Sequence, residues 1–296
     1  MHVTRRVFLL GTVSCAVLAC TPARRSSTVP NLATTEPQLT PPVSSTPAAP
    51  HPSARRAVST SLGARETLIR RYSGTQPTAW GEAVPKVVRR LPTSDRVVAL
   101  TLDACGGRTG SGYDVELIEM LQRERVPATL FLNARWIEAN PREFRRLAAN
   151  PLFEIANHGT KHRPVSVTGR SVHGIAGTGS VAEVVDEVAV NQRLITRLTG
   201  SAPAFFRSGT AYYDDLAVRV VGDLGLQVVN FDVLGDAGAT YSASEVTAAM
   251  LSSTGGSIIL AHMNRPSGGT AEGVEAAVPK LRQRGFRFVN LSDYLR

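Results

Sequence analysis

The stretch VVALTLDACGG, residues 97–107, joins a short apolar run to an acid and a pair of glycines. Residues 97–102 are almost all apolar, as expected for a strand that is buried on both faces. Asp103 ends this run, and Gly106 and Gly107 favour a turn directly after it. Active sites of parallel α/β barrels lie at the carboxyl ends of their strands. The stretch therefore predicts a central parallel strand whose last residue is available for chemistry.

Six further apolar runs of strand type follow along the chain, at 128–133, 153–159, 204–209, 226–232, 257–263 and 286–291. Helical stretches are predicted between them, at Tyr113–Arg123, Pro141–Ala149, Ser180–Leu198, Asp214–Leu224, Ala243–Leu251 and Ala271–Arg284. Ser180 and Glu183 predict a capping box, and Gly200 predicts the end of the same helix. Strands that alternate with helices imply parallel pairing and right-handed crossovers. We expect an α/β fold, a barrel of seven βα units, in preference to an open doubly wound sheet.

Polar side chains stand at the carboxyl ends of five of these runs, where a barrel gathers them at one rim. Asp103 ends the first run, and the others are His158, Arg207, Asp232 with Asp236, and His262. HGTKH, residues 158–162, places two histidines four residues apart, so a helical turn would bring both imidazoles to one metal ion. His262 follows IILA and is a candidate proton donor. His173 lies in a Gly- and Ser-rich stretch, and a solvent-exposed loop is the simpler interpretation.

The first twenty residues resemble an export signal. Arg5 and Arg6 precede an apolar stretch, 7–19, that is too short to span a membrane comfortably, and the pair resembles a twin-arginine motif. VLAC, residues 17–20, resembles a bacterial lipobox in which Cys20 would be lipidated, although Leu18 is bulkier than usual there. We expect an exported protein held at the outer face of the bacterial cytoplasmic membrane or in the envelope. Plain secretion is the alternative.

Residues 21–62 are rich in Pro, Ser and Thr and predict a disordered tether before a domain that spans 63–296. The formal charge is +9, but residues 1–71 hold nine arginines against two glutamates. Because the basic charge is concentrated in these first 71 residues, the sequence gives no support for nucleic-acid binding. Cys15 and Cys20 lie in the leader, so Cys105 has no partner in the domain for an internal disulfide.

Residues 97–296 resemble the polysaccharide deacetylase family, the NodB-homology fold, in five short motifs that occur in order. The motifs are TLDA (101–104), HGTKH (158–162), FRSG (206–209), FDVLGDAG (231–238) and LAH (260–262). The resemblance implies a distorted (β/α)7 barrel. It also implies a divalent metal ion, zinc or a similar cation, and an acetylated amino-sugar polymer as substrate.

Carried over motif by motif, the resemblance implies a role for each site residue. Asp103 is the general base and Arg207 steadies it. His158 and His162 are the metal ligands. His262 is the general acid, and Asp236 is the acid that tunes it. Such a site would activate water, polarise the acetyl carbonyl and give a proton to the departing sugar amine.

The first motif departs from the family pattern, because the usual second acid, a third metal ligand, is Ala104. Three explanations stay open. Asp103 ligates the metal and Asp232 or another acid is the base; Cys105 supplies a thiolate; or metal binding is weak and the enzyme is slow or inactive. A small buried thiol without a ligand role is our preferred interpretation of Cys105. A caspase-like nucleophile is disfavoured, since the nearest upstream histidine is His51, in the tether.

Two other motifs also differ from the pattern. Ala237 replaces the usual tryptophan of the fourth motif, and Ser208 stands where proline is common in the third. Tyr212 and Tyr213 follow and are candidates for a rebuilt sugar platform. We favour an active deacetylase with a rewired metal site. A glycan-binding protein without activity is the alternative, and a scaffold without any glycan role ranks last.

Overall fold

The structure is a computed structural model that describes residues 62–295. The predicted export signal at 1–20, with the twin arginines and Cys20, lies outside the described residues, as does the predicted tether up to residue 61. No helix in the described part of the chain is both long enough and apolar enough to cross a bilayer.

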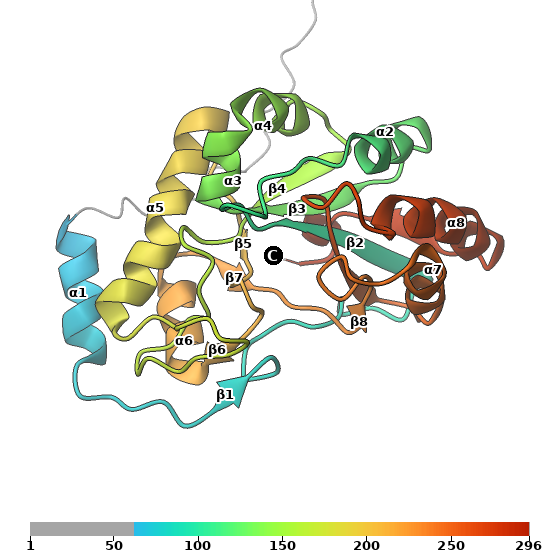
Figure 1. The fold of residues 1–296 in the computed structure, drawn as a ribbon. Helices are drawn as coiled ribbons and strands as arrows, with labels where there is room; N and C mark the ends of the chain where they lie inside the picture. Colours follow the sequence, from blue (N-terminus) through green and yellow to red (C-terminus); the bar gives the residue numbers. More distant parts are fainter. Residues whose placement is uncertain (1–61, 296) are drawn as a thin grey trace, which may run out of the picture. The chain divides into compact units, whose positions relative to one another are not determined.

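A curled parallel sheet forms the centre of the fold (Figure 1). Its strands run in the order β7 (Gln227–Val228), β5 (Phe205–Phe206), β4 (Phe153–Asn157), β3 (Ala128–Leu132), β2 (Val97–Ala104), β9 (Ser257–His262) and β8 (Val233–Leu234). β10 (Arg287–Val289) pairs with the first half of β2. All seven predicted strands are present and parallel, which confirms the distorted (β/α)7 barrel.

The barrel is closed by a chain crossing instead of a continuous ladder. The predicted strand 226–232 pairs as β7 over only two residues, and then crosses to the opposite edge of the sheet, where β8 begins. Its backbone N–H groups bond to three different segments: Val229 to Phe206, Asn230 to Val88, and Asp232 to Ile258. These three bonds satisfy buried N–H groups while the chain passes from one edge of the sheet to the other.

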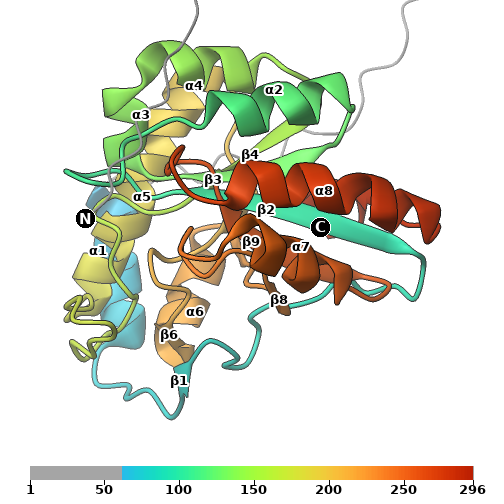
Figure 2. The same cartoon turned by 45° about the vertical axis from the view of Figure 1, so that its right-hand side comes forward.

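Helices cover the outside of the sheet in two groups. α2 (Val115–Arg123), α3 (Ala134–Ala139), α4 (Pro141–Ala148), α7 (Ala243–Leu251) and α8 (Thr270–Gln283) pack on the β2, β3 and β9 side, where α7 and α8 lie side by side (Figure 2). α5 (Val181–Thr199) and α6 (Asp215–Asp223) cover the other part, together with α1 (Leu62–Tyr72), which packs on α5. The sequence analysis did not predict α1, α3 or β8, nor the antiparallel pair β1 (Trp80–Gly81) and β6 (Tyr213–Asp214).

The caps of α5 follow the sequence only in part. Ser180 Oγ accepts the N–H of Glu183, and Gly200 ends the helix in the left-handed conformation at φ 77°, both as predicted. The return bond of the predicted capping box is absent, because the Glu183 carboxylate accepts the N–H of Gly179 and pairs with Arg163 instead. Glu183 thereby ties the start of α5 to the loop that carries the histidine pair.

Side chains alternate along β2 between two different environments. Val98, Leu100, Leu102 and Ala104 belong to the core between the sheet and its helices, whereas Val97 and Ala99 belong to a separate core that includes Phe131, Phe205 and Leu260. Asp103 is separated from Val97 and Ala99 by an even number of positions, so its side chain lies on the same face of β2 as theirs. The strand therefore directs Asp103 away from the helices and Ala104 toward them.

Candidate metal and acid–base site

The predicted site residues meet at the carboxyl ends of β2, β4, β5 and β9. Asp103 and His262 stand opposite each other in the β2–β9 pairing. His158 and Arg207 each follow directly after a paired residue of β4 and β5. The register of the parallel sheet therefore brings together four side chains that lie up to 159 positions apart in the sequence.

Arg207 is completely buried and holds the Asp103 carboxylate. Its Nη1 atom donates to Asp103 Oδ1 at 2.8 Å and to Thr101 Oγ1 at 2.9 Å. The other guanidinium nitrogens donate to the backbone carbonyls of Val229 and Asn230. The planar guanidinium is thus fixed on several sides, which leaves one orientation for the acid.

The charges around Asp103 decide its protonation state. Its side chain is only 6% exposed, and burial by itself raises the pKa of a carboxyl group. Arg207, and after it His158 and His262, outweigh the burial and hold the pKa of Asp103 below its usual value. Asp103 is therefore ionised at neutral pH, although it is buried.

His158 is oriented by a backbone carbonyl. Its Nδ1 lies 3.0 Å from the carbonyl oxygen of Arg207, which can only accept, so Nδ1 carries the proton. Nε2 keeps its lone pair, and lies 3.6 Å from Asp103 Oδ2 and 4.0 Å from Cys105 Sγ. Burial lowers the pKa of His158, which favours the neutral imidazole that metals bind.

His162 occupies an irregular loop, and the helical turn predicted for HGTKH is wrong. Gly159 and His162 both have positive φ, 75° and 62°, which an α-helix does not allow. The two imidazoles still approach each other, with ring centroids 5.0 Å apart and nearly perpendicular planes. Gly209 makes room for this arrangement, since a Cβ there would lie 2.4 Å from the His162 ring. His162 Nε2 is buried without a hydrogen-bond partner.

Glu187 of α5 holds the loop, and the sequence analysis missed it. The side chain is buried, and its Oε1 accepts the N–H groups of Thr160, Lys161 and Arg163. Oε2 accepts Lys161 as well. An acid on the apolar face of the predicted helix 180–198 was the signal available, because a buried carboxylate requires partners of this kind.

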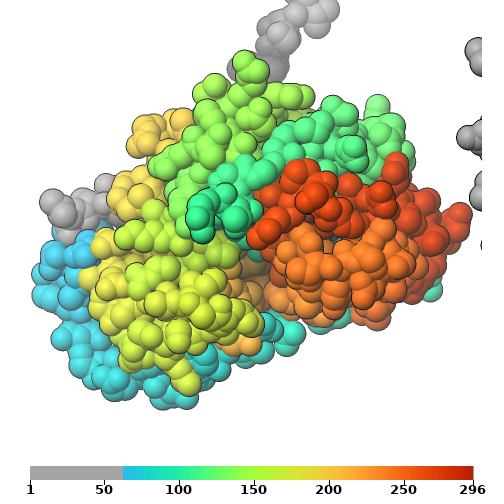
Figure 3. Space-filling view, in the orientation of Figure 1, coloured from blue at the N-terminus to red at the C-terminus, as the bar shows by residue number. Residues whose placement is uncertain are grey.

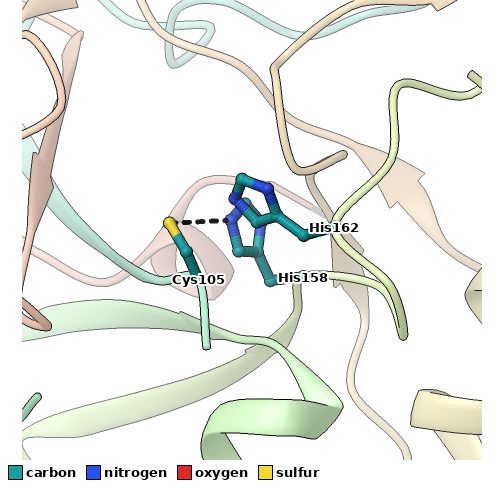
Figure 4. A group of neighbouring side chains, drawn as sticks. All are labelled: Cys105, His158 and His162. Carbon is teal, nitrogen blue, oxygen red and sulfur yellow. Dashed lines mark hydrogen bonds between the residues drawn. The ribbon is translucent and has the colours of Figure 1, made fainter. Parts of the chain in front are cut away.

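Cys105 is not the small buried thiol that the sequence favoured. It is partly exposed, and its Sγ points to the two histidines (Figure 4). One ligand atom each of Cys105, His158 and His162 lie within 4.8 Å of one another, and no carboxylate of the described residues joins this group. Burial raises the pKa of the thiol, but the hydrogen bonds and charges of His162 and then His262 lower it to about 6.

His262 forms a second ion pair beside Asp103. Its Nδ1 lies 2.8 Å from Asp236 Oδ1, while Asp236 Oδ2 accepts the backbone N–H of His262 and the hydroxyl of Thr270. Burial acts to lower the pKa of His262, and the Asp236 charge and hydrogen bond raise it well above its ordinary value. The imidazole is therefore protonated at neutral pH. Thr270 was missed, because its place at the start of α8 gives no signal in the sequence.

Three predicted residues lie elsewhere. Asp232 binds Arg90, the Ser257 hydroxyl and the N–H of Ile258 at the start of β9, which is the opposite end of the barrel. It cannot replace Asp103 as a base. Tyr213 is fully buried and is no sugar platform, whereas His173 packs its ring against Tyr212.

Residues 90–229 match the model of the polysaccharide deacetylase family. This match agrees with the family that the sequence predicted, and one relative of similar sequence is named a deacetylase. The chain is 22% identical over 226 residues to the uncharacterized protein YlxY of Bacillus subtilis, covering 76% of this chain and 65% of YlxY, so it spans just under two thirds of that relative. It is also 22% identical over 218 residues to a peptidoglycan-N-acetylglucosamine deacetylase of Bacillus cereus, covering 71% and 93% of the two chains.

Solved structures of family 4 carbohydrate esterases share the fold of this chain. A pseudoenzyme from Bacillus anthracis superposes with a TM-score of 0.60 at 21% identity, covering 72% of this chain and 70% of that one. A mutant of that pseudoenzyme has restored enzymatic activity. An acetyl xylan esterase from Clostridium thermocellum, in complex with a cobalt ion, has a TM-score of 0.56 at 23% identity, covering 67% and 89% of the chains.

Proposed function

We propose that this polysaccharide deacetylase removes N-acetyl groups from an amino-sugar polymer of the cell envelope, using a divalent metal ion held by His158 and His162. One observation carries the proposal. Asp103 and His262 face each other across β2 and β9, and their surroundings move their pKa values in opposite directions. Hydrolysis needs a base and an acid whose pKa values are moved apart in this way, whereas binding of a glycan does not need them.

The histidine pair fits a metal ion. His158 presents an Nε2 lone pair because its Nδ1 is fixed by a carbonyl, and His162 has a buried Nε2 without a partner. Neutral imidazoles of this kind suit zinc and similar transition metals. When bound, such an ion polarises the acetyl carbonyl and lowers the pKa of water.

The protein groups then supply the proton transfers. Asp103, held by Arg207, takes a proton from the attacking water. His262, charged through Asp236, gives its proton to the sugar nitrogen as the amine departs. Both groups start in the protonation state that the reaction requires at neutral pH.

A group of aromatic side chains supports a sugar polymer as substrate. Trp80 and Tyr212 are partly exposed, with ring centroids 5.8 Å apart, and Arg170 lies over the Trp80 ring. Tyr212 follows closely after Gly209, which contacts His162. Such amphipathic rings can stack on the apolar faces of sugars. In Figure 3 the yellow-green segment that follows β4 lies across from the orange and red C-terminal segments.

Acetate release from N-acetylglucosamine oligomers and from peptidoglycan tests the function, with added zinc. We expect Asp103→Asn and His262→Gln each to lower kcat by about 10²–10⁴-fold, the usual loss of a general base or acid. Asp232→Asn, the matched acid at the far end of the barrel, should leave release unchanged. Oligomer binding by the unaltered protein without any acetate release would overturn the proposal in favour of a glycan-binding protein.

We further propose that the protein is exported and anchored by a lipid on Cys20, on the strength of the twin arginines and the VLAC sequence. Fractionation of cells tests the location. The protein should appear with the membrane, and Cys20→Ala should release it. Equal amounts of both forms in the membrane would refute lipidation.

A further inference from the structure

Ala104, the position that lacks an acid, offers no side-chain atom that could bind a metal ion. Its side chain lies in the core between the sheet and the helices, together with Leu100 and Leu102. Cys105 directly follows the end of β2, and like Asp103 it approaches His158 Nε2. Its Sγ accordingly points to His158 and His162 (Figure 4).

The spacing of the three side chains fits one metal ion. Zinc bonds of about 2.1 Å to nitrogen and 2.3 Å to sulfur at a tetrahedral angle put those atoms about 3.6 Å apart. Cys105 Sγ lies 4.0 Å from His158 Nε2, and the whole group fits within 4.8 Å. A shift of a few tenths of an ångström brings the pair to bonding geometry. The unpartnered, buried Nε2 of His162 supplies the third atom.

Asp103 is the competing ligand, and its contacts argue against it. The carboxylate is bound through Oδ1 to Arg207, which is itself fixed by Thr101 and two backbone carbonyls. Its Oδ2 lies 3.6 Å from His158 Nε2, but Asp103 does not belong to the group of Cys105, His158 and His162 atoms that all lie within 4.8 Å of one another. If Asp103 ligated the metal, the site would lose its base. The other acid that the described residues place at this rim, Asp236, is bound to His262.

We propose that the Cys105 thiolate is the third protein ligand, so that Cys105, His158 and His162 form a site selective for zinc and other thiophilic metals over magnesium and manganese. Thiolate and imidazole together favour zinc, whereas magnesium and manganese prefer oxygen ligands. This inference rests on the metal-binding part of the proposed function, and it stands whether or not the bound ion supports deacetylation. It leaves Asp103 free as the base.

Cobalt substitution tests the ligand directly, because a thiolate bound to Co²⁺ gives a sulfur-to-metal charge-transfer absorption in the near ultraviolet. The experiment uses the full chain with Cys15→Ser and Cys20→Ser, so that Cys105 is the remaining one of its three cysteines. We expect one Co²⁺ per chain with this absorption. Cys105→Ser should abolish the absorption. It should also weaken zinc binding, measured by calorimetry, by at least about 100-fold, because loss of a group that only hydrogen-bonds to a ligand already costs up to about that much.

Cys105→Asp provides a second variant that should still bind metal. A carboxylate in place of sulfur should retain cobalt without the charge-transfer absorption, and should lower the preference for cadmium over manganese. Near-ultraviolet circular dichroism checks that each variant is folded. If cobalt binds the unaltered protein without the absorption, or if Cys105→Ser binds zinc as tightly as the parent, the ligand assignment is wrong. A protein with the absorption but no acetate release would support the assignment and refute deacetylation alone.

Discussion

Replacement of Arg207 by Met removes the only cation that contacts the buried Asp103 carboxylate through a hydrogen bond in the described part of the chain. Met keeps the aliphatic part of the side chain, but not the guanidinium group that lies over the Phe131 ring. It loses the bonds to Asp103 and Thr101 and to two backbone carbonyls. Breaking a buried ion pair by removing one partner costs about 3–5 kcal/mol, and we expect a loss of unfolding free energy in this range at pH 7.

The loss should depend on pH in a defined direction. In the parent, the pKa of Asp103 lies below its usual value, so its contribution to stability is present above the unfolded pKa and is lost as the pH falls through the folded one. Without Arg207, burial dominates and raises the pKa of the same carboxyl. The variant is then penalised at neutral pH and relieved when Asp103 becomes protonated. The difference between parent and variant should therefore shrink on acidification.

Guanidinium unfolding at about pH 7 and about pH 4.5 measures both effects. Arg90→Met is the matched control, since Arg90 is exposed at 44% and its pairing with Asp232 should contribute at most about 1 kcal/mol. Adding Asp103→Asn to Arg207→Met should recover part of the loss, because no charge is left buried. A loss below about 1 kcal/mol, or one that is equal at both pH values, would refute the reasoning.

Three further predictions concern the site. Asp236→Asn removes the carboxylate that raises the pKa of His262, so His262 should lose its proton at lower pH. The basic limb of the kcat/KM profile should therefore move to lower pH, and a limb that stays in place would exclude His262 as the acid. Glu187→Gln keeps the size of the side chain but loses its charge, and should weaken zinc binding by calorimetry about 10–100-fold; unchanged affinity would show that the loop holds itself. Trp80→Ala should raise KM for long oligomers by up to roughly tenfold and leave a disaccharide unaffected, whereas an equal effect on both would place Trp80 outside a sugar platform.

The sequence by itself determined the order of the strands along the chain and the identity of most polar groups at the rim. A parallel strand that is covered on both faces is apolar at nearly every position, as in residues 97–103. Such a run can be recognised from the sequence without any tertiary information. Capping residues make the ends of α5 and α7 equally recognisable in the sequence. Both helices begin and end within one residue of their predicted bounds. The five short motifs then led to Asp103, His158, Arg207, Asp236 and His262.

Only the tertiary structure decided what each side chain faces. β8 lies between Asp232 and Asp236 and places them at opposite ends of the barrel. Only three residues separate the two acids, and neither the strand pattern nor their charge distinguishes them. The loop conformation of His162 depends on Glu187, 25 residues later, and on the absence of a side chain at Gly209. Cys105 gains its role from two histidines more than 50 positions away. Such contacts arise from the packing of distant segments, and local sequence carries no record of them.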